Sequence, residues 1–433
     1  MTVTEARAGA RARHGAVGAL RHRDFALFWT TALVSNSAAW MQMVAVPAKL
    51  WKLTGSATWL GAASMASLLP AVLLTPLAGV LADRTSRRLI LIVTQNGQML
   101  FAFAFWVLYL ADELTPWRML GLLLGNGVVS GIQVAAWQSF VPTLVPREDL
   151  IDAVRLNSVQ FQAARAIGPG VGALAVSFFG IGTAFLLNAV TFVPVVIAVM
   201  VARPRQAMSA RAGEPMRHAL AEGFRYTWSR SALRRAVLTA LAVSAMGQMV
   251  IALAAGISGE IYGHSGTGGN AGLVAALGAG SLVSGLFILT RGDRIARSHM
   301  AIVGLAIYVV GILLVPLTTS YRVGMVAFAV CGLAHIPVAT SLNTFVQSSV
   351  PDEIRGRVLS FYLLGVMIGM PTGALLLGRI GDLIGLRETL VLDAIAFAAF
   401  FTIIVLRFGR LQFVDRESLD ETDTASRVGL AVS

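Results

Sequence analysis

The chain has 433 residues, of which 56% are hydrophobic and 13% are charged, and its formal net charge is +12. Soluble domains carry roughly 25% charged residues, so this chain has too few to cover the surface of a soluble protein of its length. Spans of about 20 apolar residues in a lipid bilayer account for such a composition. The single cysteine, Cys331, excludes an internal disulfide and a cysteine metal cluster. The composition therefore predicts an all-α integral membrane protein.

Twelve apolar segments, separated by charged or turn-rich breaks, follow one another along the chain. Each is long enough to cross a bilayer as a helix. The first six lie at residues 25–48, 57–81, 89–111, 117–141, 157–179 and 182–202. The second six lie at residues 236–258, 270–290, 299–317, 323–345, 358–378 and 388–406. We therefore predict twelve transmembrane helices in two six-helix bundles.

The longest internal polar break divides the predicted helices into two halves of nearly equal length. It spaces Leu220, Phe224 and Trp228 four residues apart, which predicts a short amphipathic helix at the inner membrane surface; a solvated linker is the alternative. The polar C-terminal tail has the composition of a disordered segment. The predicted units are a cytoplasmic N-tail 1–23, an N-terminal bundle 24–202, a cytoplasmic linker 203–235, a C-terminal bundle 236–406 and a cytoplasmic tail 407–433.

Basic residues are distributed unevenly between alternate breaks. With a cytoplasmic N-terminus, 27 of the 34 lysine and arginine residues lie on cytoplasmic segments, and one, Arg165, lies inside a span. This positive-inside bias places both termini in the cytoplasm, and it explains the net charge without a nucleic-acid partner. We expect Lys49, Trp51 and Lys52 to anchor the outer end of the first span at the membrane interface. The outer segments hold Lys49, Lys52, Arg118, Arg322, Arg379 and Arg387.

Two short patterns of the first half recur in the second half. Residues 138–148 read QSFVPTLVPRE, and residues 343–353 read NTFVQSSVPDE. Residues 168–174 read GPGVGAL, and residues 369–375 read GMPTGAL. Both pairs keep their order around the fifth and eleventh spans. They predict parallel repeats of six spans, related by an axis along the membrane normal, with a central path between them.

The segment GVLADRTSRRLIL, residues 79–91, places one acid and three arginines between the second and third spans. It resembles the signature of the major facilitator superfamily, both in its residues and in its position on the cytoplasmic side. Ser86 replaces the second glycine of that signature, which makes a left-handed turn there less favoured. The resemblance implies a gating loop formed by Gly79, Asp83, Arg84, Arg87 and Arg88.

The resemblance extends over residues 24–406 and favours one branch, that of exporters of the enterobactin-exporter and macrolide-efflux type. The segments that carry it are WKLTGSATWLG, LVPREDLIDAVRLNS, ARAIGPGVGAL and VPDEIRGRVLS. In the family, the aspartate of the loop braces the two bundles together on the cytoplasmic side while the transporter opens outward. The resemblance therefore implies that Asp83 faces residues 355–360 at the start of the eleventh span. Topological anchoring is the alternative role for the arginines.

A near-copy of the signature, GRIGDLIGLRETL, follows the eleventh span at residues 378–390. The alternation of the breaks places this segment on the outer side of the membrane. We therefore interpret it as the outer end of that helix. A brace for the opposite conformational state is a further hypothesis for the same segment.

The fifth span carries ARAIGPGVGA, which resembles the antiporter motif of the same family through Gly168, Pro169 and Gly172. The resemblance implies export; ordinary packing of small residues, which lets helices approach closely, is the alternative. Arg165 lies on the same helical face and therefore points into the bundle. A charge inside a span is costly and functional by default. We predict that Arg165 lines the cavity, with a bond to a backbone carbonyl as the alternative.

Further polar and titratable residues within the spans are candidates for substrate and proton sites. Asp393 in the twelfth span and His335 in the tenth are the candidates for proton coupling. A position near the outer interface is the alternative for Asp393, and packing is the alternative for His335. A mixed polar and aromatic lining suits a large amphipathic ligand. Its candidates, each of which also suits packing, are Asn36, Trp40, Gln42, Gln133, Trp137 and Arg165.

The sequence predicts a secondary transporter and not an enzyme, because it has no phosphate-binding lysine loop and no metal-ligand spacing. The predicted function is proton-coupled export of a hydrophobic or amphipathic compound, such as a drug or siderophore, without a cofactor. Proton-coupled uptake of a metabolite and a membrane sensor or scaffold of the same fold are the alternatives. We expect a monomer in the bacterial cytoplasmic (inner) membrane, with a small-molecule substrate, protons and lipid as its partners.

Overall fold

The computed structural model describes residues 18–203, 216–264, 266–407 and 414–415. Most of the predicted N-tail and C-terminal tail and part of the predicted linker lie outside these residues. The described residues form helices and no strand, in agreement with the all-α prediction. The α-helices are α2 (Arg23–Thr54), α3 (Ala57–Arg84), α4 (Arg87–Leu110), α5 (Pro116–Phe140), α6 (Leu150–Val201), α7 (Met216–Ser229), α8 (Ser231–Ala242), α9 (Met249–Gly256), α10 (Thr267–Arg291), α11 (Arg297–Leu317), α12 (Tyr321–Ser348), α13 (Asp352–Ile384) and α14 (Leu386–Arg407).

Ten helical segments among the described residues are long and apolar enough to cross a membrane. They fall on α3, α4, α5, residues 170–201 of α6, the stretch from α8 to residue 261, and α10 to α14. The predicted span 25–48 is absent from this set because α2 carries polar side chains, among them Asn36 and Gln42. The predicted span 157–179 falls on the first part of α6. A total of twelve spans therefore stays a prediction.

The long helix α6 consists of two helices that meet at Gly180. Its 52 residues would form a straight rod of about 78 Å, far longer than the hydrocarbon thickness of about 30 Å. At Gly180 the backbone leaves the helical region, with φ 79° and ψ 172°. Glycine tolerates positive φ because it has no Cβ atom. The sequence predicts the break between the fifth and sixth spans at this same point.

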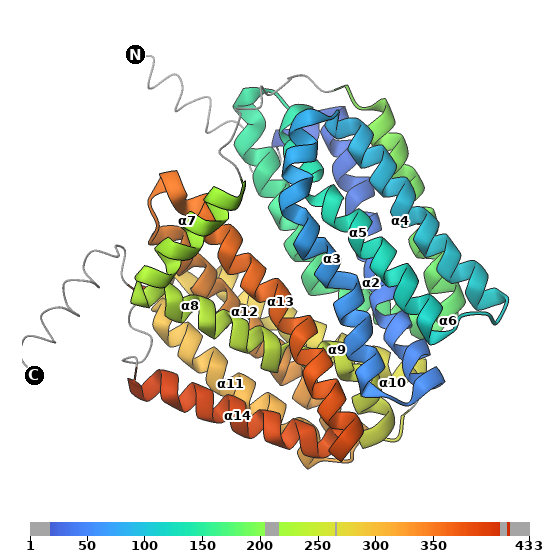
Figure 1. Ribbon diagram of the computed structural model, residues 1–433, viewed down its shortest axis with the longest axis vertical. Helices are drawn as coiled ribbons and strands as arrows, with labels where there is room; N and C mark the ends of the chain where they lie inside the picture. The colour runs from blue at the N-terminus through green and yellow to red at the C-terminus, as the bar shows by residue number, and fades with distance from the viewer. Residues whose placement is uncertain (1–17, 204–215, 265, 408–413, 416–433) are drawn as a thin grey trace, which may run out of the picture.

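Two groups of helices make up the described structure. Figure 1 shows α2 to α6 on one side of the molecule and α7 to α14 on the other. In the first group, α2 packs along α6 and α3 packs along α5; in the second, α10 and α11 pack along α12. The two groups meet mainly where α3 packs against α13 and where α6 packs against α10.

The two segments of the sequence repeat make similar packing contacts in the structure. In the first group, a Cβ atom added to Gly172 would lie 2.7 Å from the backbone of Trp40 in α2. In the second group, a Cβ atom added to Gly373 would overlap the carbonyl oxygen of Ala245, which follows α8. In each half, a glycine of the repeated motif therefore lets its helix approach the first helix of that half.

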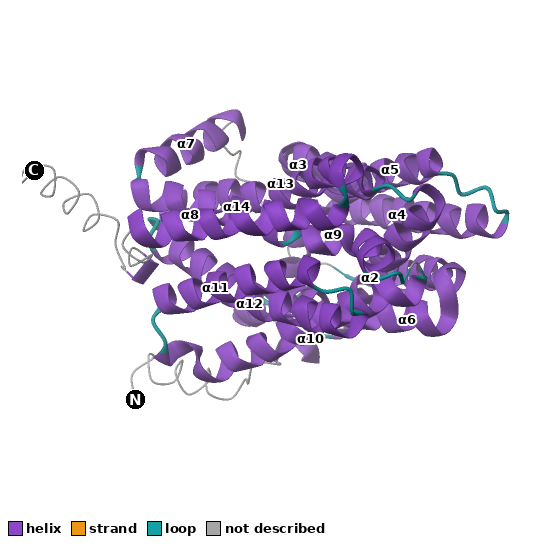
Figure 2. Ribbon diagram, turned by 90° about the horizontal axis from the view of Figure 1, so that it is seen from below, coloured by secondary structure: helices purple, strands orange, loops and turns teal. Residues whose placement is uncertain are grey.

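The predicted linker helix is present as α7. Its Phe224 and Trp228 rings stack with centroids 5.2 Å apart and are partly exposed, whereas the side chain of Leu220 lies outside the described ones. Figure 2 shows α7 at the edge of the molecule. An exposed aromatic face on a peripheral helix is typical of a helix that lies at a membrane surface.

Contacts with α13 hold α7 in place. Glu222 forms an ion pair with Arg357, and the ring of Phe224 lies edge-on to that of Phe361 with centroids 5.4 Å apart. A Cβ atom added to Gly223 would lie 2.8 Å from the carbonyl oxygen of Arg357. The linker helix is therefore packed against the start of α13 and is not a fully solvated segment.

Candidate functional site

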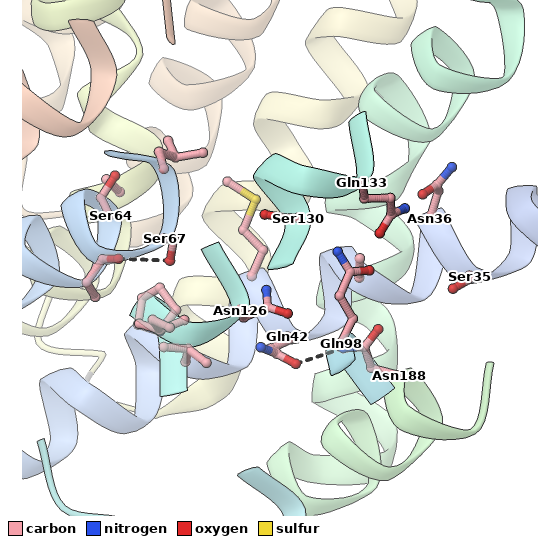
Figure 3. A pocket seen from close by; sticks show the side chains of 18 of the residues that line it. Ser35, Asn36, Gln42, Ser64, Ser67, Gln98, Asn126, Ser130, Gln133 and Asn188 are labelled. Carbon is pink, nitrogen blue, oxygen red and sulfur yellow. Dashed lines mark hydrogen bonds between the residues drawn. The ribbon is translucent and has the colours of Figure 1, made fainter. Parts of the chain in front are cut away.

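A cavity of about 360 Å³ lies between the two groups of helices. Helices α2 to α6 supply its polar lining, and Ile251, Ala252 and Met370 supply apolar atoms from the second group. Figure 3 shows the polar side chains of the first group directed into this space. The amide and hydroxyl side chains that line the cavity are Ser35, Asn36, Gln42, Ser64, Ser67, Gln95, Gln98, Asn126, Ser130, Gln133 and Asn188.

Four of the predicted cavity residues line this cavity. Asn36 and Gln42 reach it from α2, and Gln133 and Trp137 reach it from α5. Trp40 is not among the lining residues. It lies two residues before Gln42 and so faces another side of α2, where it packs against the glycines of α6.

Most of the amide and hydroxyl groups that line the cavity were not predicted from the sequence. Gln95 and Gln98 lie three residues apart on α4, and Asn126, Ser130 and Gln133 lie four and three residues apart on α5. Residues at these spacings share one face of a helix. A stripe of polar residues along one face of each helix could therefore have indicated the cavity. A single amide in an apolar segment does not distinguish a cavity residue from a packing residue.

Several polar atoms in the cavity have no hydrogen-bond partner within the described part of the protein. Asn188 donates from Nδ2 to Oε1 of Gln42 over 2.7 Å, and its own Oδ1 has no partner. Oε1 of Gln95, Oε1 of Gln133 and Nδ2 of Asn36 are also without partners. Unpaired buried polar groups are costly, so a hydrogen-bond partner that reaches any of these atoms would be stabilising.

The predicted gating loop joins α3 to α4. Gly79, Asp83 and Arg84 lie in the last turns of α3, and their side chains fall outside the described ones. Ser86, which replaces a glycine of the family signature, has φ −57° and is the N-cap of α4, accepting a hydrogen bond from the N–H of Leu89. Serine favours this position, so the loop turns here without a left-handed residue.

The two described arginines of the gating loop bind backbone carbonyls of their own group. Arg87 donates from Nη1 to the carbonyl oxygen of Ser139 over 3.3 Å, and Arg88 donates to the carbonyl oxygen of Met200. Both carbonyls lie in the last turns of helices, where they lack intrahelical partners and carry the negative end of the helix dipole. These arginines therefore fasten the loop to α5 and α6.

The predicted antiporter motif lies where α6 packs against α2. A Cβ atom added to Gly168 would overlap the ring of Trp40, and Gly172 contacts the backbone of the same residue. The side chains of Arg165 and Pro169 lie outside the described ones. Close helix packing therefore accounts for both glycines of the motif.

The two groups are joined at the ends of α3 and α13 that lie away from the gating loop. Asp382 of α13 accepts hydrogen bonds from the backbone N–H groups of Ala57, over 2.7 Å, and Thr58, over 3.1 Å, at the start of α3. Its Oδ2 also accepts from Oγ of Ser56 over 2.5 Å. A carboxylate here satisfies unpaired N–H groups and faces the positive end of the helix dipole. We call this contact, formed by Ser56, Ala57, Thr58 and Asp382, the closed end.

Backbone contacts between α3 and α13 continue from the closed end. A Cβ atom added to Gly61 would overlap Cα of Leu375 and lie 2.5 Å from the carbonyl oxygen of Ala374. A Cβ atom added to Gly378 would overlap the carbonyl oxygen of Ala57. In Figure 1 the two groups converge at this end and diverge toward the opposite end.

Comparison with known proteins identifies the family. Residues 14–431 match the transmembrane secretion effector family of the major facilitator superfamily. This chain is a member of that family. Macrolide efflux protein A of Streptococcus pyogenes is 24% identical over 382 residues, which cover 85% of this chain and 92% of that protein. The staphyloferrin A transporter of Staphylococcus aureus is 23% identical over 339 residues, which cover 77% and 83% respectively.

Solved structures support the fold. The crystal structure of a mutant of the nucleoside transporter NupG superposes with a TM-score of 0.71 at 12% identity, covering 88% of this chain and 99% of that one. Likeness at this identity shows the fold alone. The chain is a multi-pass membrane transporter with efflux relatives, and it is not an enzyme.

The C-terminal end of α2 differs from the prediction for this transporter. Trp51 is only 9% exposed, and its ring packs against Gly256 and Gly259 of the second group. It is therefore a contact between the groups and not an interfacial anchor. Lys49 lies 3.7 Å from Oδ1 of Asp112. The sequence identifies the amphipathic indole ring of Trp51, but it does not show which helix covers that ring.

The two candidates for proton coupling, Asp393 and His335, lie in the second group. Asp393 on α14 is 3% exposed, and its Oδ2 has no partner within the described part of the protein. One turn later, Phe397 lies edge-on to Tyr308 with centroids 5.8 Å apart. The imidazole of His335 lies edge-on to the same tyrosine at 6.4 Å. Asp393 is thus inside the protein, away from the amide-lined cavity.

Proposed function

We propose that this transporter exports hydrophobic or amphipathic small molecules, of the drug or siderophore class, by proton-coupled alternating access. The observation that carries the proposal is the cavity between the two groups, because its mixed polar and apolar lining suits an amphipathic ligand. Relatives named for macrolide efflux and staphyloferrin A transport support cargo of this kind. In such transporters, two bundles rock about a site near the bilayer midplane.

We also propose the orientation and the state of the protein. The arginine-rich breaks lie at the helix ends opposite the closed end, so the positive-inside rule places the closed end outside the cytoplasm. We propose that both termini are then cytoplasmic, and that the protein is a monomer with twelve spans in the inward-facing state. Asp382, in the near-copy of the signature, braces this state.

Three further roles follow from the family resemblance and belong to this proposal. Asp83 braces the cytoplasmic side in the outward-facing state, together with the other residues of the gating loop. Arg165 contacts substrate within the cavity. The motif formed by Gly168, Pro169 and Gly172 favours export by shaping the α2–α6 contact.

The test of export uses inverted membrane vesicles that contain the protein. The test compounds are a labelled panel of neutral, cationic and anionic drugs and siderophores. We expect members of this panel to accumulate inside the vesicles when the interior is made more acidic than the medium. Vesicles without the protein are the control. Gradient-driven loss from preloaded vesicles would instead indicate uptake in the cell. No gradient-dependent movement of any compound would favour a sensor or scaffold.

Replacing Asp393 with asparagine is expected to uncouple transport from protons. The asparagine keeps the size of the buried side chain but cannot exchange a proton, and buried acids within spans commonly serve proton relays. We expect movement along a substrate gradient to remain and accumulation driven by pH to be lost. Vesicle transport with and without the pH gradient separates the two. Unchanged gradient-driven accumulation would remove Asp393 from the coupling mechanism.

A further inference from the structure

We propose that the cavity selects uncharged molecules that carry several hydrogen-bonding groups over organic cations. This inference rests on the proposed function, because it names the chemical class of the substrate at the same site.

The described lining of the cavity is polar but uncharged. Every polar side chain in it is an amide, a hydroxyl or the indole of Trp137, and no acid, lysine, arginine or histidine is among the described lining residues. Asp393, the buried acid of α14, does not line it. These polar groups can therefore form hydrogen bonds with a ligand, but they cannot neutralise a charge on it.

The amides are placed to bind a neutral ligand. Each amide offers two donor hydrogens and an acceptor oxygen. Gln95 is 2% exposed and Asn188 is 3% exposed, and each has an oxygen without a partner. Asn36 on α2 leaves a nitrogen without a partner. A ligand with hydroxyl, carbonyl or amide groups suits these side chains when they rotate toward it, because it supplies both donors and acceptors.

A cationic ligand would lose more than it gains in this cavity. An ionised group that leaves water must be paired with an opposite charge or hydrogen-bonded at every position, or its transfer is strongly unfavourable. The described lining has no negative charge to pair with a cation. The apolar remainder of the lining, which includes Leu60, Leu123 and Phe192, weakens the solvation of an ion further.

Direct binding to the purified protein tests the inference. The probes are chloramphenicol, a neutral molecule with hydroxyl and amide groups, and tetraphenylphosphonium, a permanent cation of comparable bulk. We expect the wild-type protein to bind chloramphenicol at least about tenfold more tightly than tetraphenylphosphonium. Equilibrium dialysis with radiolabelled probes measures both constants under the same conditions.

A single substitution should reverse this preference. Gln98 lines the cavity from α4 and is partly exposed, so Gln98→Glu adds a carboxylate of nearly the same shape without burying it fully. We expect the affinity for tetraphenylphosphonium to rise about tenfold and that for chloramphenicol to fall. Gln347→Glu is the matched control, because this substitution makes the same chemical change at an exposed position of α12. It should bind both probes as the wild type does.

The outcomes separate this inference from the proposed function. Equal or tighter binding of tetraphenylphosphonium by the wild type would overturn the inference and leave export intact. An equal gain of cation binding in Gln98→Glu and Gln347→Glu would also overturn it, because the effect would then not arise in the cavity. Failure of every compound to move in the vesicle assay would overturn the proposed function itself. A reversal confined to Gln98→Glu supports the inference.

Discussion

Replacing Asp382 with asparagine is expected to shift the transporter away from the inward-facing state. The carboxylate accepts hydrogen bonds from Ser56, Ala57 and Thr58 across the closed end. The amide loses the negative charge at the start of α3 and one of the two acceptor oxygens. Loss of a helix cap costs about 0.5–2 kcal/mol, which corresponds to a change in population of roughly 2- to 30-fold. Transport should slow because the inward-facing state no longer persists.

Spin labels at the ends of the two groups beside the closed end measure this shift. Glu113→Cys and Thr319→Cys place the labels in two exposed loops, and because the native Cys331 is buried we expect only the introduced cysteines to react. The distance distribution between the labels should gain a longer component in Asp382→Asn. An unchanged distribution would show that the closed end does not depend on Asp382.

Two matched substitutions sharpen this experiment. Asp112→Asn removes an exposed acid from the same side of the molecule and should leave the distances unchanged, because Asp112 faces only Lys49 of its own group. Asp83→Asn should still insert into the membrane but transport poorly, and it should shift the distances in the direction opposite to Asp382→Asn. A shift of both variants in the same direction would contradict the assignment of the two braces to opposite states.

Replacing Gly61 with valine is expected to prevent closure at the same end by steric overlap. The added Cβ atom would meet backbone atoms of Leu375 and Ala374, which cannot rotate away. Forcing extra atoms into a packed contact costs about 1–3 kcal/mol, and separation of α3 from α13 relieves it. We therefore expect the outward-facing state to accumulate and vesicle transport to fall by at least about tenfold.

Gly121→Val is the control for this substitution. Gly121 lies on α5, and a Cβ atom added there meets no atom within 4 Å. Its transport and its label distances should match those of the wild type. Size-exclusion chromatography of both variants checks that they fold. Normal transport by a well-folded Gly61→Val protein would show that α3 and α13 need not touch during the cycle.

The helical content and the approximate boundaries of most helices could be predicted from the sequence. Apolar runs of membrane length have only one stable form in lipid, because the helix satisfies every backbone polar group within the segment. The break at Gly180 was also predictable, since glycine tolerates the positive φ found there. The predicted span 25–48 illustrates the limit of this reasoning, because α2 is polar on the face that lines the cavity.

The cavity was only partly predictable. Asn36, Gln42, Gln133 and Trp137 were identified as polar or aromatic residues within spans, and the structure places all four at the cavity. Trp40 was assigned to it on the same grounds, but it packs against glycines of α6. Residue type does not show which face of a helix meets which neighbour, and that choice depends on the packing of helices distant in the chain.

Composition, span length and a local signature are enough to predict a helical membrane transporter of the major facilitator type, because none of them depends on a long-range contact. The hydrogen bonds of Asp382 to the start of α3, in the opposite half of the chain, are seen only in the folded protein. The same holds for the amides of α2 to α6 that line one cavity. Both arrangements depend on how helices distant in the chain pack against one another, which no local pattern encodes.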